Sequence, residues 1–240
     1  MKEAGERPAT VAWADLGLVD YRRAWQLQEA LLDSLREDAP AKAREAGYLL
    51  LLEHPHVYTL GRNGKPDNLL ASAAQLQARG AELIRVNRGG DITYHGPGQL
   101  VAYPILKLHR LGIGARDYVH RLEEVAIRTV GAYGLTGERL EKASGVWIAP
   151  GTPAARKICA VGVRCSRAIT MHGFALNVST DLSCFGYINP CGFADKGVTS
   201  LQKETGKPAG LDDVKQLVLR HFAAVFAVEL TALNPNSANF

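Results

Sequence analysis

The chain has 240 residues, 47% hydrophobic and 22% charged, and its 28 basic and 24 acidic residues give a formal net charge of +4. This length suits one large domain or two small ones, with enough apolar material for a core that needs neither disulfides nor a metal. The charges are spread out rather than gathered in a basic stripe of the kind that binds nucleic acid. No apolar run approaches the roughly 18–20 residues that span a bilayer. Residues 1–13 lack the apolar core of a secretory signal. We expect a cytoplasmic protein that binds neither nucleic acid nor membrane.

The hydrophobic pattern along the chain predicts alternating helices and strands. Helices are expected over residues 20–38, 68–79, 116–134 and 211–226, and strands over residues 48–53, 81–86, 100–106, 157–164 and 169–178. Pro104 favours an edge strand or a strand end, because proline cannot donate to a β-ladder. There is no regular βαβ rhythm, so we expect an α+β fold, a mixed sheet flanked by helices, rather than a doubly wound parallel sheet. One domain over residues 1–230 and a polar tail over residues 231–240 are expected.

The segment RGGDITYHGPGQL (residues 88–100) concentrates glycine and proline. Adjacent glycines let a ligand approach the backbone and leave N–H groups exposed, but they serve a tight turn equally well. The segment matches neither a P-loop nor GxGxxG. His95 within it and His172 in MHGFALN fit structural roles as well as catalytic ones. Neither stands in HExxH or GxSxG, so a zinc protease or a serine hydrolase has no support.

The four cysteines form no CxxC pair and no zinc-finger spacing, so neither structural zinc nor a disulfide is expected. Cys159 and Cys165 alternate within an apolar strand and, like Cys184, are expected to be small core residues. Cys191 lies between proline and glycine in INPCGF, a loop where a thiol can be exposed and where a nearby cation would favour the thiolate. Lys157 heads the apolar run KICAVGVR; its spacing does not link it to Cys191, and a solvated strand end would explain it.

Four segments in this order and spacing, RGGDITYHGPGQLVAYPI, KICAVGVR, HGFALNV and INPCG, resemble the octanoyl transferases of lipoate biosynthesis, the lipoyl (octanoyl) protein transferase B family. The resemblance covers roughly residues 20–230 and implies the fold of the biotin and lipoate protein ligase catalytic domains. It implies transfer of an octanoyl or lipoyl group from acyl carrier protein to a lysine of the lipoyl domains in 2-oxoacid dehydrogenase complexes or of the glycine cleavage H protein. No ATP, cofactor or metal is expected.

By motif position, the resemblance makes Cys191 the nucleophile that forms an acyl thioester and Lys157 the residue that lowers the pKa of its thiol. It also implies an acyl-binding pocket lined by Arg88, Gly89, Gly90, Asp91, Ile92, Thr93, Tyr94, His95, Ala160, Val161, Gly162, Gly173, Phe174 and Ala175.

Two alternative functions remain open at this point. An ATP-dependent lipoate or biotin ligase on the same fold would activate a free acid and would not need Cys191; the sequence has no recognisable ATP-binding element. A non-catalytic acyl- or protein-binding module would use the glycine-rich surface alone.

Overall fold

The structure is a computed structural model that describes residues 8–36, 45–189 and 196–233. Its largest element is a mixed sheet formed by β1 (Ala9–Leu18), β2 (Glu45–Glu53), β6 (Gln99–Leu106), β7 (Gly137–Leu140), β8 (Ala143–Ile148), β9 (Arg156–Ser166), β10 (Ile169–Asn177), β11 (Gly197–Val198) and β12 (Val228–Ala232). The strand order is β12-β1-β2-β6-β10-β9-β8-β7, and β11 pairs with β9. A second sheet joins β3 (Val57–Leu60), β4 (Glu82–Arg85) and β5 (Ile92–His95) in the order β4-β3-β5.

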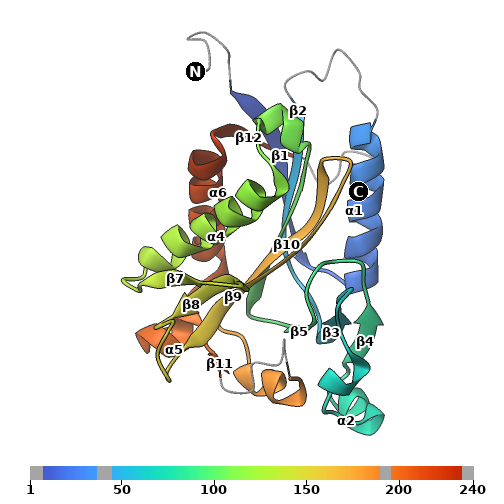
Figure 1. The fold of residues 1–240 in the computed structure, drawn as a ribbon, viewed down its shortest axis with the longest axis vertical. Helices are drawn as coiled ribbons and strands as arrows, with labels where there is room; N and C mark the ends of the chain where they lie inside the picture. The colour runs from blue at the N-terminus through green and yellow to red at the C-terminus, as the bar shows by residue number, and fades with distance from the viewer. Residues whose placement is uncertain (1–7, 37–44, 190–195, 234–240) are drawn as a thin grey trace.

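Helices cover both faces of the large sheet (Figure 1). The helices are α1 (Tyr21–Arg36), α2 (Ala73–Ala78), α3 (Leu108–Leu111), α4 (Ala115–Gly131), α5 (Leu201–Thr205) and α6 (Leu211–Phe226), with 3-10 turns η2 (Pro66–Asn68) and η3 (Leu182–Tyr187). Helices α4 and α6 lie together on one face, and α1 lies on the other. The α+β prediction is therefore confirmed. Among the described residues, no helix is long and apolar enough to cross a bilayer.

The continuous apolar run of β2 follows from this two-sided burial. Leu49 and Leu51 belong to the core cluster beneath α4 and α6, whereas Leu50 and Leu52 belong to the cluster beneath α1. All four side chains have 0% exposure. Because successive side chains of a strand point to opposite faces, a strand buried on both faces is apolar throughout rather than alternating.

The predicted helices over residues 20–38, 116–134 and 211–226 are confirmed as α1, α4 and α6. The prediction over residues 68–79 is correct only for its last part, α2. Helix α2 begins after Ser72, whose Oγ accepts from the backbone N–H of Gln75 while the Gln75 side chain accepts from the backbone N–H of Ser72. This capping box fixes the helix start. The strands β1, β3, β5, β7, β8, β11 and β12 were not predicted.

The expectation that Pro104 marks an edge or a strand end is wrong, because β6 lies between β2 and β10. The backbone N–H of Lys107 donates to Ala46 O, so by alternation the missing N–H of Pro104 faces β10. There the side chain of Thr170 replaces the ladder: its Oγ1 donates to Pro104 O (2.9 Å) and accepts from the backbone N–H of Leu106 (3.0 Å). A hydroxyl thus makes an interior proline tolerable.

The cysteine expectations hold for two residues of the described chain. Cys159 and Cys184 are fully buried, but Cys165 is exposed, so the prediction of a core role for Cys165 is wrong. Cys165 lies near the turn between β9 and β10, in the half of β9 where no residue is fully buried. Alternation alone does not reveal how far along a strand the core extends.

We predict that Thr170→Val lowers the free energy of unfolding by about 1–3 kcal/mol, because the buried N–H of Leu106 loses its acceptor. Urea denaturation measures this loss. The control is Thr231→Val on the edge strand β12, where the side chain is exposed; it should change stability by less than about 0.5 kcal/mol. Equal stability of Thr170→Val and the wild type would contradict this account of Pro104.

Candidate active site

A cavity of about 470 Å³ opens between β9, β10 and the segment before β5. This volume is in the range of small-molecule sites. Of the residues that the sequence places around an acyl group, the cavity is lined by Arg88, Gly89, Gly90, Asp91, Ile92, Thr93, His95, Ala160, Val161, Gly162, Gly173, Phe174 and Ala175, and Lys157 lines it as well. Segments far apart in the chain therefore meet at one site.

The guanidinium of Arg88 joins the two sheets at the cavity wall. Its Nη2 donates to Thr59 O (2.7 Å) and to Thr59 Oγ1 (2.8 Å) in β3, and Nη1 donates to Gly89 O (3.0 Å). The backbone N–H of Gly89 donates to Val163 O in β9 (2.9 Å). A Cβ on Gly162 would lie 3.1 Å from the Arg88 Cδ, so glycine lets the arginine stem lie flat against β9. The RGG segment is therefore both a structural turn and a cavity wall.

Small residues on β9 and β10 leave room for a ligand. Ala160 pairs with Ala175, and Gly162 pairs with Gly173. A Cβ on Gly173 would lie 2.1 Å from Ala102 O, so only glycine allows β10 to approach β6 this closely. The part of the cavity wall that β9 and β10 form therefore consists largely of small, apolar residues.

Three neutral histidines lie in and behind the far end of the cavity. His54 donates from Nδ1 to Val19 O (2.7 Å) and accepts at Nε2 from the Tyr103 hydroxyl (2.8 Å). His95 Nδ1 hydrogen-bonds Gln99 Oε1 (2.7 Å), and its ring stacks on Tyr21. Burial lowers the pKa of His54 to about 4 and that of His95 well below its ordinary value. His95 thus lines the cavity and braces the glycine-rich segment at once.

His172 is the third of these histidines. Its backbone φ is +59°, its Nε2 hydrogen-bonds Asn87 Oδ1 (2.7 Å), and its backbone N–H donates to Gln28 Oε1 (2.8 Å). Burial, with smaller effects of Arg88 and Arg164, lowers its pKa to about 3. The ring is therefore an uncharged part of the cavity lining near neutral pH.

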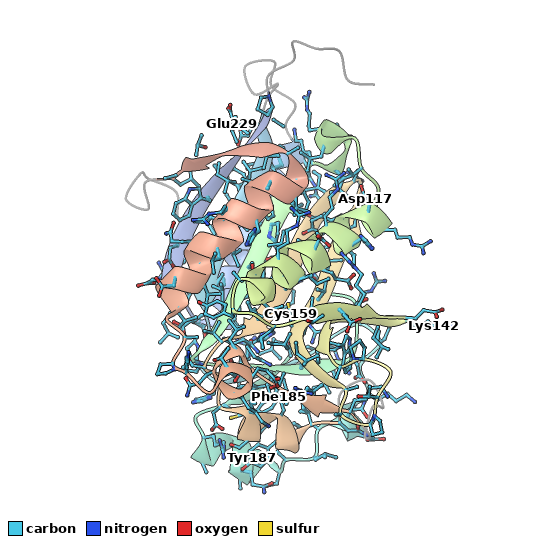
Figure 2. The ribbon with its side chains drawn as sticks, turned by 90° about the vertical axis from the view of Figure 1, so that its left-hand side faces the viewer. Asp117, Lys142, Cys159, Phe185, Tyr187 and Glu229 are labelled. Carbon is cyan, nitrogen blue, oxygen red and sulfur yellow. The ribbon has the colours of Figure 1, made fainter. Side chains whose placement is uncertain are left out.

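Lys157 stands at the opposite end of the cavity. Its Nζ donates to Ser144 O (3.0 Å) and lies 4.7 Å from the centre of the Trp147 ring. These contacts hold the ammonium at the cavity rather than leaving it as a loose strand end. Lys142 and Lys196 line the same cavity, and Lys142 points outward at the turn between β7 and β8 (Figure 2).

Cys191 lies outside the described residues. The described residues on either side of it, Asn189 and Lys196, lie at or near the cavity wall. The backbone N–H of Asn189 donates to Asn68 O (2.8 Å), and Lys196 lines the cavity. Asn68 in turn donates from Nδ2 to Asp91 Oδ2 (2.6 Å) at the cavity wall.

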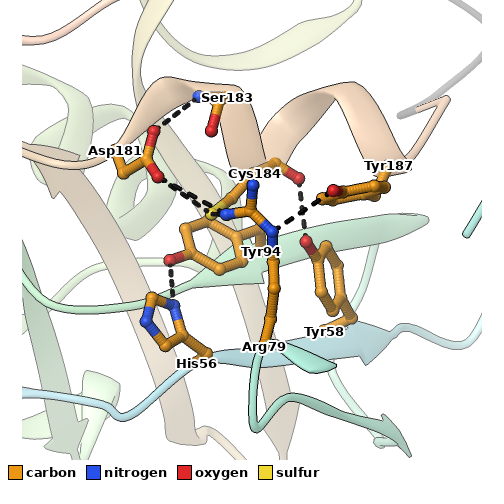
Figure 3. A network of polar contacts seen from close by, with 8 residues as sticks. All are labelled: His56, Tyr58, Arg79, Tyr94, Asp181, Ser183, Cys184 and Tyr187. Carbon is orange, nitrogen blue, oxygen red and sulfur yellow. Dashed lines mark hydrogen bonds and ion pairs between the residues drawn. The ribbon is translucent and has the colours of Figure 1, made fainter. Parts of the chain in front are cut away.

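Tyr94 does not line the cavity, although the sequence places it there. Neighbours in a strand face opposite ways, and Thr93 and His95 occupy the cavity side of β5. The Tyr94 hydroxyl hydrogen-bonds His56 Nδ1 (2.7 Å) (Figure 3). In the same network, the Tyr58 hydroxyl of β3 donates to Cys184 O (2.9 Å) and fastens η3 to the small sheet, and Arg79 Nη1 after α2 contacts Cys184 Sγ (3.2 Å).

Several lining residues were not predicted from the sequence. They include Tyr21, Gln99, Tyr103, Ser144 and Trp147. Gln99 lies in the glycine-rich segment and could have been included; the others carry no local signal, because only the fold brings α1, β6 and β8 to the cavity. Among the described residues, no group of His, Cys, Asp and Glu is arranged to hold a metal ion.

Residues 20–223 match the family described as the lipoyl protein ligase A/B catalytic domain. The octanoyltransferase of Bacteroides thetaiotaomicron is 55% identical over 205 residues, which cover 84% of this chain and 89% of that protein. The octanoyltransferase of Flavobacterium johnsoniae is 49% identical over 223 residues, with coverages of 90% and 96%.

A solved structure of lipoate-protein ligase A bound with ATP aligns with a TM-score of 0.68 at 15% identity, covering 95% of this chain and 90% of that one. At this identity the likeness is one of fold alone, and it confirms the expected ligase-like architecture.

We predict that acid destabilises the protein through its buried histidines. The folded pKa of His54 (about 4) lies below 6.5, so the unfolded chain takes up the proton first. The stability that neutral His54 provides is complete above about pH 6.5 and is lost as the pH falls towards 4. Between pH 7 and pH 5 this one residue should account for a loss of about 2 kcal/mol.

Urea denaturation of the wild type and of His54→Gln at both pH values measures this loss. The variant should lose about 2 kcal/mol less than the wild type between pH 7 and pH 5. His120→Gln on the exposed surface of α4 is the control and should behave as the wild type does. An unchanged pH dependence in His54→Gln would contradict the burial of a neutral His54.

Proposed function

The chain belongs to the lipoyl protein ligase A/B catalytic-domain family and, within it, to the octanoyltransferases, and we propose that it moves an octanoyl group from acyl carrier protein to a protein lysine through a thioester on Cys191. The observation that carries this proposal is the identity to octanoyltransferases over most of the chain, for example 53% over 213 residues that cover 95% of the Bacteroides fragilis relative. The proposed acceptors are the lipoyl domains of 2-oxoacid dehydrogenase complexes and the glycine cleavage H protein.

The cavity suits a medium-length acyl chain. Its walls of alanine and glycine on β9 and β10 present apolar surface, and a chain lying there would be removed from water. Each methylene so buried contributes about 0.8 kcal/mol to binding. The carbonyl end of the acyl group belongs at the Lys157 end, because the reacting groups must meet there.

The first half of the proposed reaction is thioester exchange. The Lys157 ammonium stabilises the Cys191 thiolate by its charge, and the thiolate sulfur attacks the thioester carbonyl. The bond from the carbonyl carbon to the carrier sulfur breaks as the bond to Cys191 forms. The leaving carrier sulfur takes a proton from the Lys157 ammonium, so the carrier departs as a thiol and Lys157 is left neutral. One thioester replaces another, so the exchange is nearly isoenergetic and needs no ATP. The oxyanion of the intermediate forms at the same end of the cavity, where the charge of the Lys157 ammonium also stabilises it.

The second half forms the amide. The acceptor lysine attacks the Cys191 thioester with its neutral amine, the carbon–sulfur bond breaks, and the Cys191 thiolate is regenerated. The attacking amine must lose a proton, and a neutral Lys157 can accept it. Lys157 therefore has two tasks, charge stabilisation before acylation and proton transfer after it.

We predict that incubation with octanoyl-acyl carrier protein adds one octanoyl mass to the protein and that hydroxylamine removes it. Peptide mapping by mass spectrometry should place the adduct on Cys191. Cys191→Ser should form no hydroxylamine-labile adduct. An adduct on Cys159, Cys165 or Cys184, or none at all, would contradict the mechanism.

We predict that Lys157→Ala and Lys157→Arg separate the two tasks of this lysine. The alanine variant loses the charge, so the pKa of the Cys191 thiol rises and its alkylation slows at neutral pH. The arginine variant keeps the charge and the alkylation rate, but a guanidinium cannot be deprotonated, so transfer from the acyl-enzyme to the lipoyl domain slows.

Iodoacetamide alkylation of Cys191 against pH and single-turnover transfer measure the two effects. Lys65→Ala, an exposed lysine away from the cavity lining, is the control and should alter neither. Alkylation of Lys157→Ala at the wild-type rate at every pH would refute the charge role.

A further inference from the structure

The peptide group between Ser144 and Gly145 in β8 makes a hydrogen bond on each of its two sides. Its carbonyl oxygen accepts from Lys157 Nζ (3.0 Å), and its N–H donates to Glu123 Oε1 (2.9 Å). The C=O and the N–H of a trans peptide point in opposite directions. The carboxylate of Glu123 and the ammonium of Lys157 therefore lie on opposite sides of one peptide group and are both bonded to it.

Glu123 is a buried carboxylate that the proposed mechanism does not use. It lies on α4 with 7% exposure and does not line the cavity. Its second oxygen, Oε2, accepts from Arg139 Nε (3.2 Å). A carboxylate is costly to bury unless its oxygens are hydrogen-bonded. One of the donors that satisfy Glu123 belongs to the same peptide that holds Lys157.

The backbone of β8 approaches β9 closely at this peptide. Gly145 has a φ of +119°, and a Cβ there would lie 2.3 Å from Cys159 O, so only glycine allows this approach. The pairing of β8 with β9 becomes irregular just after it, between Val146 and Trp147. The hydrogen bond from the Gly145 N–H to Glu123 fixes the plane of the peptide, and with it the direction in which the Ser144 carbonyl points.

Two further cations line the cavity near Lys157. Lys142 lies two residues before Ser144, and Lys196 lies immediately before β11, the strand that pairs with β9 at Lys157. Neighbouring cations disfavour an ammonium, whereas a nearby carboxylate favours it. A hydrogen bond from a peptide N–H to a carboxylate also polarises the peptide, so its carbonyl becomes a stronger acceptor. Glu123 opposes the repulsion in both ways.

We propose that Glu123 is a positioning residue for Lys157 and acts on it through the Ser144–Gly145 peptide. The carboxylate fixes the direction of the Ser144 carbonyl and stabilises the ammonium that this carbonyl binds. The inference rests on the proposed function, since it concerns the lysine that both half-reactions use. After Lys157 has protonated the leaving carrier sulfur, the same carboxylate favours its return to the ammonium, which is the proton transfer that amide formation requires.

The test is Glu123→Gln, which keeps the size of the side chain and removes its charge. Lys157 is labelled with trace acetic anhydride at a series of pH values, and its acetylation is mapped by mass spectrometry. Only the neutral amine reacts, so the midpoint of the pH profile reports how strongly the ammonium is stabilised. We expect the midpoint to fall, so that labelling at a fixed pH below it becomes about threefold faster, the effect of one charge across a peptide group. The kcat/KM for octanoyl transfer should fall about tenfold, because the ammonium is held less firmly in place.

Glu124→Gln is the matched control. Glu124 is the next residue of α4 and also accepts from Arg139 (2.9 Å), but its other bond leads to Arg128 rather than to β8. The labelling midpoint and kcat/KM of this variant should match those of the wild type. Equal shifts in the two glutamine variants would trace the effect to the shared arginine and overturn the proposal, as would an unchanged midpoint in Glu123→Gln.

Arg139→Gln provides a second test, which serves if Glu123→Gln does not fold. It removes a partly exposed cation from the Glu123 carboxylate and leaves the bond to Gly145 in place. The labelling midpoint of Lys157 should therefore rise rather than fall. An unchanged or lower midpoint in this variant would contradict the coupling between Glu123 and Lys157.

The labelling separates this inference from the proposed function, because it involves neither Cys191 nor an acyl donor. If the midpoints shift as expected while the wild type accepts no octanoyl group, the proposed function fails and the positioning of Lys157 by Glu123 stands. If the wild type transfers the octanoyl group and the midpoint does not change in Glu123→Gln, the positioning role fails alone.

Discussion

The buried guanidinium of Arg88 connects the small sheet to the large one, and the cavity depends on that connection. A buried cation is tolerated only when its donors are satisfied, and Arg88 meets this requirement with Thr59 and Gly89. The backbone of Gly89 then bonds β9 directly. Gly162 is small because the arginine stem lies against it. The glycine-rich segment needs small residues because its backbone bonds β9 through Gly89 and still leaves a cavity open beside it.

The two ends of the cavity differ in their electrostatics. At one end, the Lys157 ammonium is held by Ser144 O and the Trp147 ring, where a positive charge favours a thiolate and an oxyanion. At the other, burial and nearby arginines keep His95 and His172 uncharged. Between them lies a wall of small residues. This gradient from charged to neutral suits a ligand that is reactive at one end and inert at the other.

Patterns within single segments predicted α1, α4 and α6 and the strands β2, β6, β9 and β10 of the large sheet, because helical and strand periodicities are local. Contacts between segments were beyond such patterns. Pro104 was misplaced because the hydroxyl that replaces its ladder bond is Thr170, 66 residues away. Cys165 was misplaced because exposure depends on where the core ends. The family resemblance, which encodes the fold, identified the glycine-rich segment and the small residues of β9 and β10 that line the cavity. Tyr21 and Trp147 come from other segments and required the structure.

A ligase bound to ATP shares this fold at 15% identity, so the architecture does not distinguish an ATP-dependent ligase from a carrier-dependent transferase. The difference lies in how the acyl group is activated: as an adenylate, or as a thioester that already stores the energy. The most direct measurement supplies the purified protein with octanoyl-acyl carrier protein and a lipoyl domain, in the presence of an enzyme that destroys ATP. We predict octanoylation of the acceptor lysine under these conditions. No transfer from the carrier, together with octanoylation in a parallel reaction supplied with free octanoate and ATP, would contradict the thioester mechanism.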